Sequence, residues 1–250
     1  MKSLIFCPVG IPVHTYPALY DENNHWRFTK PERLYDTVVY QYKDDFVPEP
    51  GTYDFIEKAK GYKWEIAKHF LDTFDYSGYE YIGFFDDDVI TDIESVNHAI
   101  TLATEKNIKL FQLSLADGSE RSHHILFQDK SLKYSITSFN EGMGCFIHVS
   151  LIPIFLEFCK FHQPKSGCGL DLIMAHITKE QAMVIHERSM FHPPREFYGY
   201  VSKYYDQSAA DSEMYHILGN VYPQFMRHKY GQDTGPFNIP HTVHALVFNN

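Results

Sequence analysis

One stretch, residues 79–89 (YEYIGFFDDDV), limits the fold more than any other part of the sequence. Its apolar run 82–85 has the length and composition of a buried central strand. Three carboxylates, Asp86, Asp87 and Asp88, follow directly at the end of that run. Open α/β sheets bind their ligands outside the carboxyl ends of the strands. The stretch therefore predicts an α/β fold with an acidic site at the end of a central strand.

The three adjacent carboxylates favour a metal site. They repel one another, and a divalent cation would turn that repulsion into attraction. Carboxylate oxygens are the ligands that Mg²⁺ and Mn²⁺ prefer, so Mn²⁺ or Mg²⁺ is the expected ion. The alternative is a solvated turn before a helix, where acidic residues are favourable. An EF-hand calcium loop is excluded, because the sixth position from Asp86 is Thr91 instead of glycine.

Length and composition narrow the class of protein. A chain of 250 residues forms one large domain or two small ones. The formal net charge of -10 argues against a nucleic-acid binder that is held by phosphate contacts. The four cysteines show no C-x-x-C spacing, which is typical of reduced thiols in a cytoplasmic protein. No run of 18 apolar residues occurs, so no transmembrane segment is expected.

The remaining chain alternates between strand-like and helix-like segments. Strands are expected at 4–7, 35–42, 108–115, 132–139 and 182–185, and helices over 61–74, after Thr91, after Ser150 and over 170–178. Thr91 matches the N-cap of a capping box, and Ser150 is the expected cap of a helix with Pro153 in its first turn. From residue 196 the pattern becomes tyrosine-rich and weakly helical. We therefore expect a core of residues 1–195 and a C-terminal appendage of residues 196–250 that packs on it.

Three further segments are candidates for ligand contact. Pro8, Val9 and Gly10 follow the first expected strand, where a base or ribose could lie against backbone, although ordinary turn punctuation explains them equally well. Lys63 is one of three lysines near the helix 61–74 and could face a pyrophosphate, the alternative being a solvated side chain. Gly144 is the second of two glycines beside an apolar run, which suggests close approach of backbone to a ligand.

An acid and two histidines complete the candidates. Asp171 lies in the first turn of the helix 170–178, where it either complements the helix dipole or stands at the mouth of a site. His186 and His192 both follow the short strand expected at 182–185. Either could give an imidazole to a metal held by aspartates, and a lone histidine can equally be a satisfied structural residue.

Four blocks, in this order, carry a resemblance to a known family. They are 35–42 (YDTVVYQY), 63–71 (KWEIAKHFL), 79–88 (YEYIGFFDDD) and 167–172 (GCGLDL), supported by the stretch 141–146. The order resembles a small glycosyltransferase of the GT-A class, and it is most similar to the family catalogued as DUF707. The resemblance covers roughly residues 1–195. It implies a GT-A-like, Rossmann-like mixed α/β sheet flanked by helices, as in nucleotide-diphospho-sugar transferases.

The resemblance also implies roles for the acidic triplet. Asp86 and Asp88 occupy the positions of the D-x-D motif, which in GT-A enzymes binds a metal that bridges the donor diphosphate. By this pattern Asp88 ligates the metal, and Asp86 lies nearer the ribose or a metal-bound water. Asp87 is the intervening residue at the nucleotide site. His192 best matches the further C-terminal ligand of many GT-A enzymes, with His186 as the second choice.

The implied activity is transfer of a sugar from a UDP- or GDP-sugar to a glycan or another hydroxyl acceptor. Asp171 matches the position of the catalytic base in inverting members, and Lys63 and Trp64 belong to the block expected at the nucleotide. Two other classes remain open. One is a metal-dependent phosphohydrolase or nucleotidyltransferase, which needs a second cluster of metal ligands. The other is an inactive, carbohydrate-binding relative.

Overall fold

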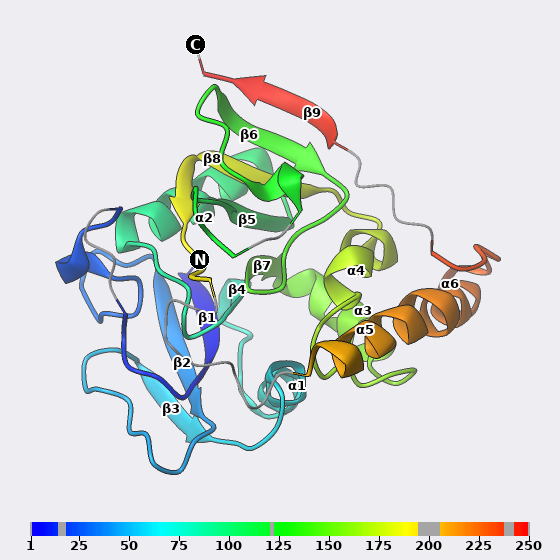
Figure 1. Cartoon of the computed structure of the whole chain (residues 1–250), viewed down its shortest axis with the longest axis horizontal. Helices are drawn as coiled ribbons and strands as arrows, with labels where there is room; N and C mark the ends of the chain where they lie inside the picture. Colours follow the sequence, from blue (N-terminus) through cyan, green and yellow to red (C-terminus); the bar gives the residue numbers. More distant parts are fainter. Residues whose placement is uncertain (1, 15–18, 121–122, 195–205, 238–242, 250) are drawn as a thin grey trace.

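A computed structural model describes residues 2–14, 19–120, 123–194, 206–237 and 243–249. The chain folds into a mixed α/β structure, with one nine-stranded sheet flanked by helices (Figure 1). The order of the strands is β3-β2-β1-β4-β7-β5-β8-β6-β9. This confirms the fold class predicted from the sequence. Within the described residues, none of the helices is long and apolar enough to span a membrane.

The sheet combines parallel and antiparallel pairs. Its strands are β1 (Lys2–Val9), β2 (Tyr35–Gln41), β3 (Phe55–Lys58), β4 (Tyr79–Phe85), β5 (Leu110–Leu115), β6 (Leu132–Thr137), β7 (Gly144–His148), β8 (Ala182–Met190) and β9 (Val243–Phe248). Strands β3, β2, β1 and β4 are parallel to their neighbours in that order, and so are β5 and β8. Strand β7 runs antiparallel between β4 and β5. Its first residue, Gly144, therefore pairs with Phe85, the last residue of β4.

Helices cover both faces of the sheet. They are α1 (Lys63–Thr73), α2 (Ile93–Lys106), α3 (Ile152–Phe158), α4 (Leu170–Thr178), α5 (Gln207–His216) and α6 (Tyr222–Tyr230), with a π-helical turn, Ile217–Val221, between the last two. Short 3₁₀ turns lie at Glu22–Asn24, His124–Leu126 and Val149–Leu151. In Figure 1, α2 lies on one side of the sheet, and α1, α3 and α4 lie on the other. Helices α5 and α6 form an outer layer beyond α3 and α4.

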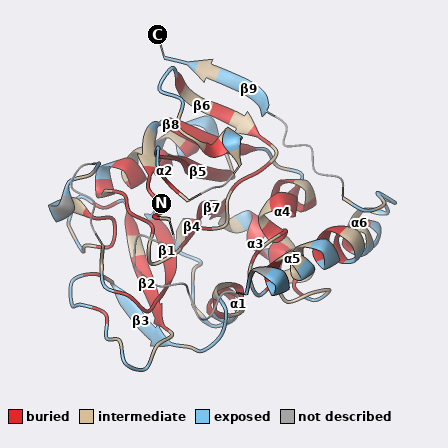
Figure 2. Ribbon diagram, viewed as in Figure 1, coloured by how far each residue is buried: buried red, intermediate tan, exposed pale blue. Residues whose placement is uncertain are grey.

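Strand β4 is central because its side chains fill the core on both faces. Successive side chains of a strand point to opposite faces. The Phe84 ring stacks on Trp64 of α1, with ring centroids 5.3 Å apart. The next ring, Phe85, packs against Trp26 on the other face, at 4.8 Å. Figure 2 shows the buried residues concentrated in these inner strands, with β3 and β9 exposed at the two edges. The acidic triplet therefore follows directly after a strand that core packing holds on both faces.

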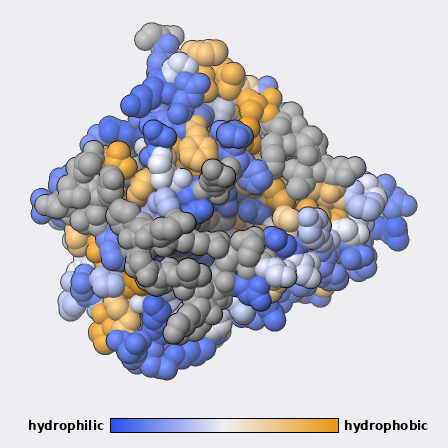
Figure 3. Space-filling view, in the orientation of Figure 1, coloured by the Kyte–Doolittle hydropathy of each residue, from blue (hydrophilic) through white to orange (hydrophobic). Residues whose placement is uncertain are grey.

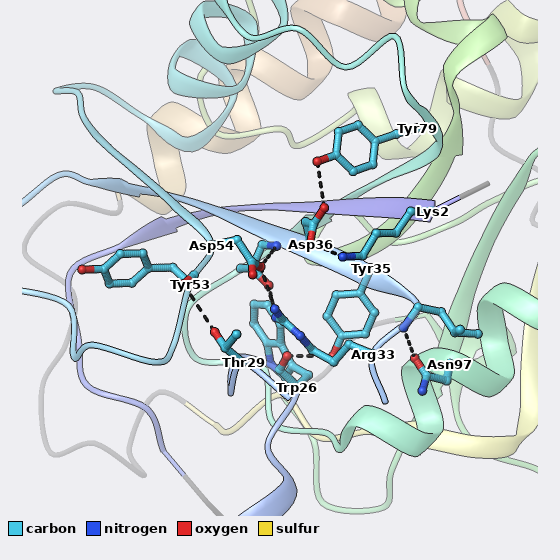
Figure 4. Close-up of polar contacts among 12 residues, drawn as sticks. Lys2, Trp26, Thr29, Arg33, Tyr35, Asp36, Tyr53, Asp54, Tyr79 and Asn97 are labelled. Atoms are coloured by element: carbon cyan, nitrogen blue, oxygen red, sulfur yellow. Dashed lines mark hydrogen bonds and ion pairs between the residues drawn. The ribbon is translucent and has the colours of Figure 1, made fainter. Parts of the chain in front are cut away.

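A polar network fixes the amino ends of the first strands (Figure 4). Arg33 Nη2 lies 2.6 Å from Asp54 Oδ2, and the same oxygen accepts the Thr37 N–H at 2.7 Å. The Tyr35 hydroxyl donates to the Trp26 carbonyl at 2.7 Å. The Arg33 side chain is almost fully buried, so its charge is paired inside the protein. The network lies at the end of β2 opposite to the acidic triplet and holds that edge of the sheet in place.

Two helix caps differ from the sequence prediction. The N-cap of α2 is Asp92, whose carboxylate accepts a backbone N–H in the first turn, so the prediction of Thr91 is wrong by one residue. The Thr91 hydroxyl instead donates to the Ser189 carbonyl of β8 at 3.0 Å. Helix α3 begins at Ile152 with no side-chain cap, because Ser150 belongs to the preceding 3₁₀ turn. Both expected caps are short polar residues whose hydroxyls have other partners: the Ser189 carbonyl for Thr91 and His148 Nδ1 for Ser150.

One strand continues well past its predicted end, and two strands were not predicted. Strand β8 continues past residue 185 to Met190, through polar residues that the sequence pattern places outside a strand. Strands β3 and β9 were not expected, and β9 pairs with β6 although it lies in the expected appendage. Exposed apolar side chains occupy both edge strands, at Phe55, Ile56, Val243, Leu246 and Phe248. Figure 3 shows the corresponding apolar surface over β9 at the top and near β3 at the lower left. The division at residue 195 stays a prediction.

Candidate functional site

Two segments that lie far apart in the sequence meet at the carboxyl end of β4. Ile90 and Phe191 exchange two backbone hydrogen bonds, each 2.8 Å long. This bridge places His192, two residues after the end of β8, beside the acidic triplet. Ligand atoms of Asp86, Asp88 and His192 all lie within 4.8 Å of one another. The structure thus brings together the three residues expected at the metal, and it leaves their binding of an ion as a prediction.

The cluster contains polar atoms that a cation would satisfy. Asp88 Oδ1 and His192 Nδ1 are buried and have no hydrogen-bond partner among the described residues. His192 Nε2 lies 3.5 Å from Asp88 Oδ1, which is an ion-pair contact and too long for a good hydrogen bond. Unpartnered buried polar atoms are costly and call for an explanation. Two carboxylates and one imidazole fit a divalent cation, so the residues present suit the expected Mn²⁺ or Mg²⁺.

The protein's own cations partly balance the cluster. Burial alone would lower the pKa of His192, but the Asp88 and Asp86 carboxylates raise it to about 9. Burial acts to raise the pKa of Asp88, and the charge of His192 outweighs it and lowers that pKa. For Asp86, burial raises the pKa even though Lys63 opposes the shift. His192 is therefore a cation near neutral pH when no metal is bound.

Lys63 and Trp64, which the sequence predicts at the nucleotide, contact other parts of the protein. Lys63 Nζ lies 2.6 Å from Asp86 Oδ1 and also donates to the Gly142 and Phe84 carbonyls, at 2.7 and 3.2 Å. The lysine joins three backbone segments, and its charge is already paired. Trp64 is 3% exposed and stacks on Phe84 in the core. Both residues therefore have partners within the protein, and their contact with a nucleotide stays a prediction.

Asp87 holds the loop that follows β1. Its Oδ2 accepts the Gly10 N–H at 2.7 Å and the next N–H of the chain at 3.1 Å, and the Tyr42 hydroxyl lies 3.5 Å away. A Cβ at Gly10 would lie 2.3 Å from the Tyr42 ring, so only glycine fits there. Pro8 and Val9 are buried in β1. Burial and then the charge of Asp88 raise the pKa of Asp87 to about 7. The N–H groups expected to face a base or ribose are thus engaged by Asp87.

Asp171 lies in the first turn of α4 beside a second acid. Its Oδ1 accepts the backbone N–H groups of Gly169 and Leu172, at 3.0 and 2.9 Å. Its side chain also shares a hydrogen bond with the carboxyl group of Glu141. Burial, and next the charge of Glu141, raise the pKa of Asp171 well above its usual range. The expected base therefore belongs to a pair of carboxyl groups.

Glu141 was missed by the sequence prediction. Its charge is one of the causes that raise the pKa of the His192 imidazole, after those of Asp88 and Asp86. The segment after it lines the site as well, because the Met143 carbonyl accepts the Asp86 N–H at 2.9 Å. A Cβ at Gly144 would lie 2.6 Å from a methionine sulfur of β8. The signal available in the sequence was an acid directly before two glycines.

His186 lies away from the metal cluster. It is a buried residue of β8, 3% exposed. Its Nε2 lies 3.0 Å from Ser135 Oγ, and its Nδ1 accepts the Asp129 N–H at 3.1 Å. Burial lowers its pKa. Both ring nitrogens are therefore used in structural contacts, and of the two candidate histidines only His192 lies with the aspartates.

Comparisons with known proteins identify the fold. No family model and no curated protein matches the chain. The crystal structure of residues 1–349 of S. aureus TarS matches with a TM-score of 0.51 at 11% identity, covering 92% of this chain and 74% of that one. A structure of longer TarS matches with a TM-score of 0.50 at 9% identity, covering 92% and 44%. TarS is a glycosyltransferase, and at such identities the similarity concerns the fold alone. The chain has a GT-A-like glycosyltransferase fold.

Proposed function

We propose that this protein is a metal-dependent glycosyltransferase that moves a sugar from a nucleotide-diphosphate donor to an acceptor hydroxyl. The donor is a UDP- or GDP-sugar, and the acceptor is a glycan or another hydroxyl compound. One observation carries the proposal: Asp86, Asp88 and His192 converge at the carboxyl end of β4, where a sheet of this class receives its ligand. The likeness to the DUF707 family stays part of this proposal, because it rests on the four sequence blocks.

Each part of the site has a task in such a transfer. Asp86, Asp88 and His192 would hold Mn²⁺ or Mg²⁺, and a bound cation neutralises the charge that develops on the departing diphosphate. Asp171 accepts the proton of the acceptor hydroxyl as its oxygen attacks the sugar, which gives inversion. General-base assistance of this kind contributes roughly 10²–10⁴-fold in rate. Two backbone N–H groups hold Asp171 Oδ1, so the orientation of the base is fixed.

The group of candidate metal ligands favours transfer over the hydrolytic alternative. Phosphohydrolases and nucleotidyltransferases commonly use two metal ions about 3.5–4 Å apart, and the second needs its own ligands. Within the described ranges, Asp86, Asp88 and His192 form the sole group of three or more metal-type ligands. A single cation at the end of β4 suits a donor whose diphosphate leaves intact.

The products of sugar-nucleotide turnover test the proposal. UDP-GlcNAc is a first probe, since the TarS fragment has been crystallised with it, and other UDP- and GDP-sugars complete the donor panel. With Mn²⁺ and a panel of glycan acceptors, we expect release of the nucleoside diphosphate. Asp171→Asn should abolish transfer and keep donor binding. Release of sugar phosphate and nucleoside monophosphate would contradict transfer, and normal transfer by Asp171→Asn would remove the assigned base.

A further inference from the structure

We propose that Glu141 is a positioning residue that shares a proton with Asp171 and thereby controls when that carboxylate can act as the base. This inference deepens the proposed function and rests on it, since it concerns the same site. Glu141 itself precedes β7, whereas Asp171 opens α4, so the pair joins two segments that lie apart in the sequence.

The two segments that carry Glu141 and Asp171 both lie against the side chain of Trp64. A Cβ at Gly142, the residue after Glu141, would lie 3.4 Å from the Trp64 ring. A Cβ at Gly167, four residues before Asp171, would lie 2.1 Å from Trp64 Nε1. Both segments thus lie against the same indole, and at residue 167 the approach is close enough to require glycine. Because Trp64 is buried and stacked in the core, it holds the two segments at a fixed separation.

The backbone around Glu141 is held on both sides. Its N–H donates to the Oε1 of Gln112, a fully buried residue of β5. The carbonyl of the next residue, Gly142, accepts the Lys63 ammonium at 2.7 Å. On the other side of the pair, two N–H groups already occupy Asp171 Oδ1. The backbone N–H of Glu141 and the Oδ1 atom of Asp171 are therefore held by different partners.

The charges around the pair favour a single shared proton. Two neighbouring carboxyl groups in a desolvated site oppose each other's ionisation. Burial and Glu141 hold the pKa of Asp171 well above its usual range. Two cations lie near the pair. The charge of Glu141 helps to raise the pKa of His192, and Lys63 and both acids influence the pKa of the same Cys145 thiol. The expected resting state is a pair with one proton and one negative charge.

This state has a direct consequence for transfer. When the shared proton is on Glu141, Asp171 is ionised and can accept the proton of the acceptor hydroxyl. The acceptor oxygen then forms a bond to the anomeric carbon, and the bond from that carbon to the diphosphate breaks. Its electron pair leaves with the nucleoside diphosphate. Both acids are protonated at the end of the step, and the pair releases one proton to solvent before the next turnover.

The coupling can be measured directly on the 250-residue chain without knowing the acceptor. We suggest ¹³C NMR titration of the side-chain carboxyl groups of labelled aspartate and glutamate, in wild type, Glu141→Gln and Asp171→Asn. Glutamine removes the negative charge and keeps a hydrogen-bonding group, so the titration midpoint of Asp171 should fall by about one pH unit or more. In Asp171→Asn, the midpoint of Glu141 should change as well. Glu105→Gln, an exposed change on α2, should leave Asp171 unaltered.

The outcomes separate this inference from the proposed function. An Asp171 midpoint that is the same in wild type and Glu141→Gln overturns the shared proton, and the reciprocal variant repeats the test if one of them fails to fold. Binding of UDP and of GDP by the wild-type protein with Mn²⁺ is measured in parallel. Coupled carboxyl groups without binding of either nucleotide would contradict the transferase alone. Binding of one of the nucleotides with independent carboxyl groups would contradict the role of Glu141 alone.

Discussion

The three consecutive aspartates have three different partners. Asp86 is paired with Lys63, Asp87 with the N–H groups of the loop after β1, and Asp88 with His192. These partners thus offset the repulsion among the three carboxylates before any metal binds. The sequence showed the repulsion, and it suggested His192 through the placement of a histidine after a strand. It could not show the partner of Asp86 or Asp87, because those contacts depend on how distant segments meet.

Affinity for metal should depend strongly on pH. The neighbouring carboxylates keep His192 protonated below a pKa of about 9, and only the neutral imidazole can bind a metal. Binding then releases one proton, so affinity for Mn²⁺ should rise about tenfold per pH unit between pH 6 and pH 8. Calorimetric titration with Mn²⁺ at both values checks this. Equal affinities at pH 6 and pH 8 would mean that His192 is not a ligand, and His192→Asn should weaken the dependence.

Replacing Lys63 should destabilise the metal-free protein. Lys63→Met leaves Asp86 without its counter-charge and two carbonyls without their donor. The free energy of unfolding should fall by about 1–3 kcal/mol, as for hydrogen bonds to charged groups. Denaturant unfolding measures the change. The control is Lys68→Met on the same helix, whose partly exposed pair with Asp72 should contribute about 0–1 kcal/mol. Equal losses in the two variants would argue against a special role for Lys63.

Among the elements, the apolar run of β4 and the periodic helices α1 and α4 were predictable from local pattern. The predicted extent of β8 was too short because the second half of the strand is polar, although its pairing with β5 continues to Met190. Strand β7 was harder still, since nothing local shows that it runs antiparallel between β4 and β5. That pairing brings Glu141 to the site, which explains why the sequence alone did not reveal it.

The close contact between α1 and the segment before α4 should be sensitive to one added methyl group. Gly167 has a φ of +84° and its Cβ would clash with Trp64, so Gly167→Ala meets both backbone strain and overlap. We expect a loss of about 2–4 kcal/mol in unfolding free energy. Gly51→Ala is the matched control, with a φ of +83° and nothing within 4 Å, and should cost about 1–2 kcal/mol. If the two losses are equal, Trp64 does not constrain the segment.

At the scale of the whole molecule, one edge of the sheet collects the candidate residues from four strands. The ends of β1, β4 and β8 and the start of β7 contribute, together with the first turn of α4. The resemblance carried by the four sequence blocks was enough to predict this class of fold. The pairing of β9 with β6 was not predictable, because no local pattern shows which strand a distant segment joins.

The net charge of -10 opposes the binding of an anionic donor, so a bound metal ion has a central role in the proposed function. A diphosphate approaching an acidic protein needs a local cation, and Lys63 and His192, which contact Asp86 and Asp88, are already paired with these carboxylates. A bound Mn²⁺ would supply the missing positive charge. The affinity of a nucleoside diphosphate should therefore depend on the metal and on the residues that hold it.

Calorimetric titration of UDP into the protein, with Mn²⁺ and with EDTA, tests this dependence most directly. GDP is titrated in parallel, because either nucleotide can belong to the donor. Asp88→Asn removes the ligand charge with little change in volume, and Asp75→Asn, an exposed change beyond the opposite end of β4, is its control. With Mn²⁺, we expect the wild-type protein and Asp75→Asn to bind one of the two nucleotides. The affinity should fall at least about tenfold when EDTA replaces Mn²⁺, and also in Asp88→Asn. A nucleotide affinity that is the same with Mn²⁺ and with EDTA, and the same in wild type and Asp88→Asn, would contradict the account.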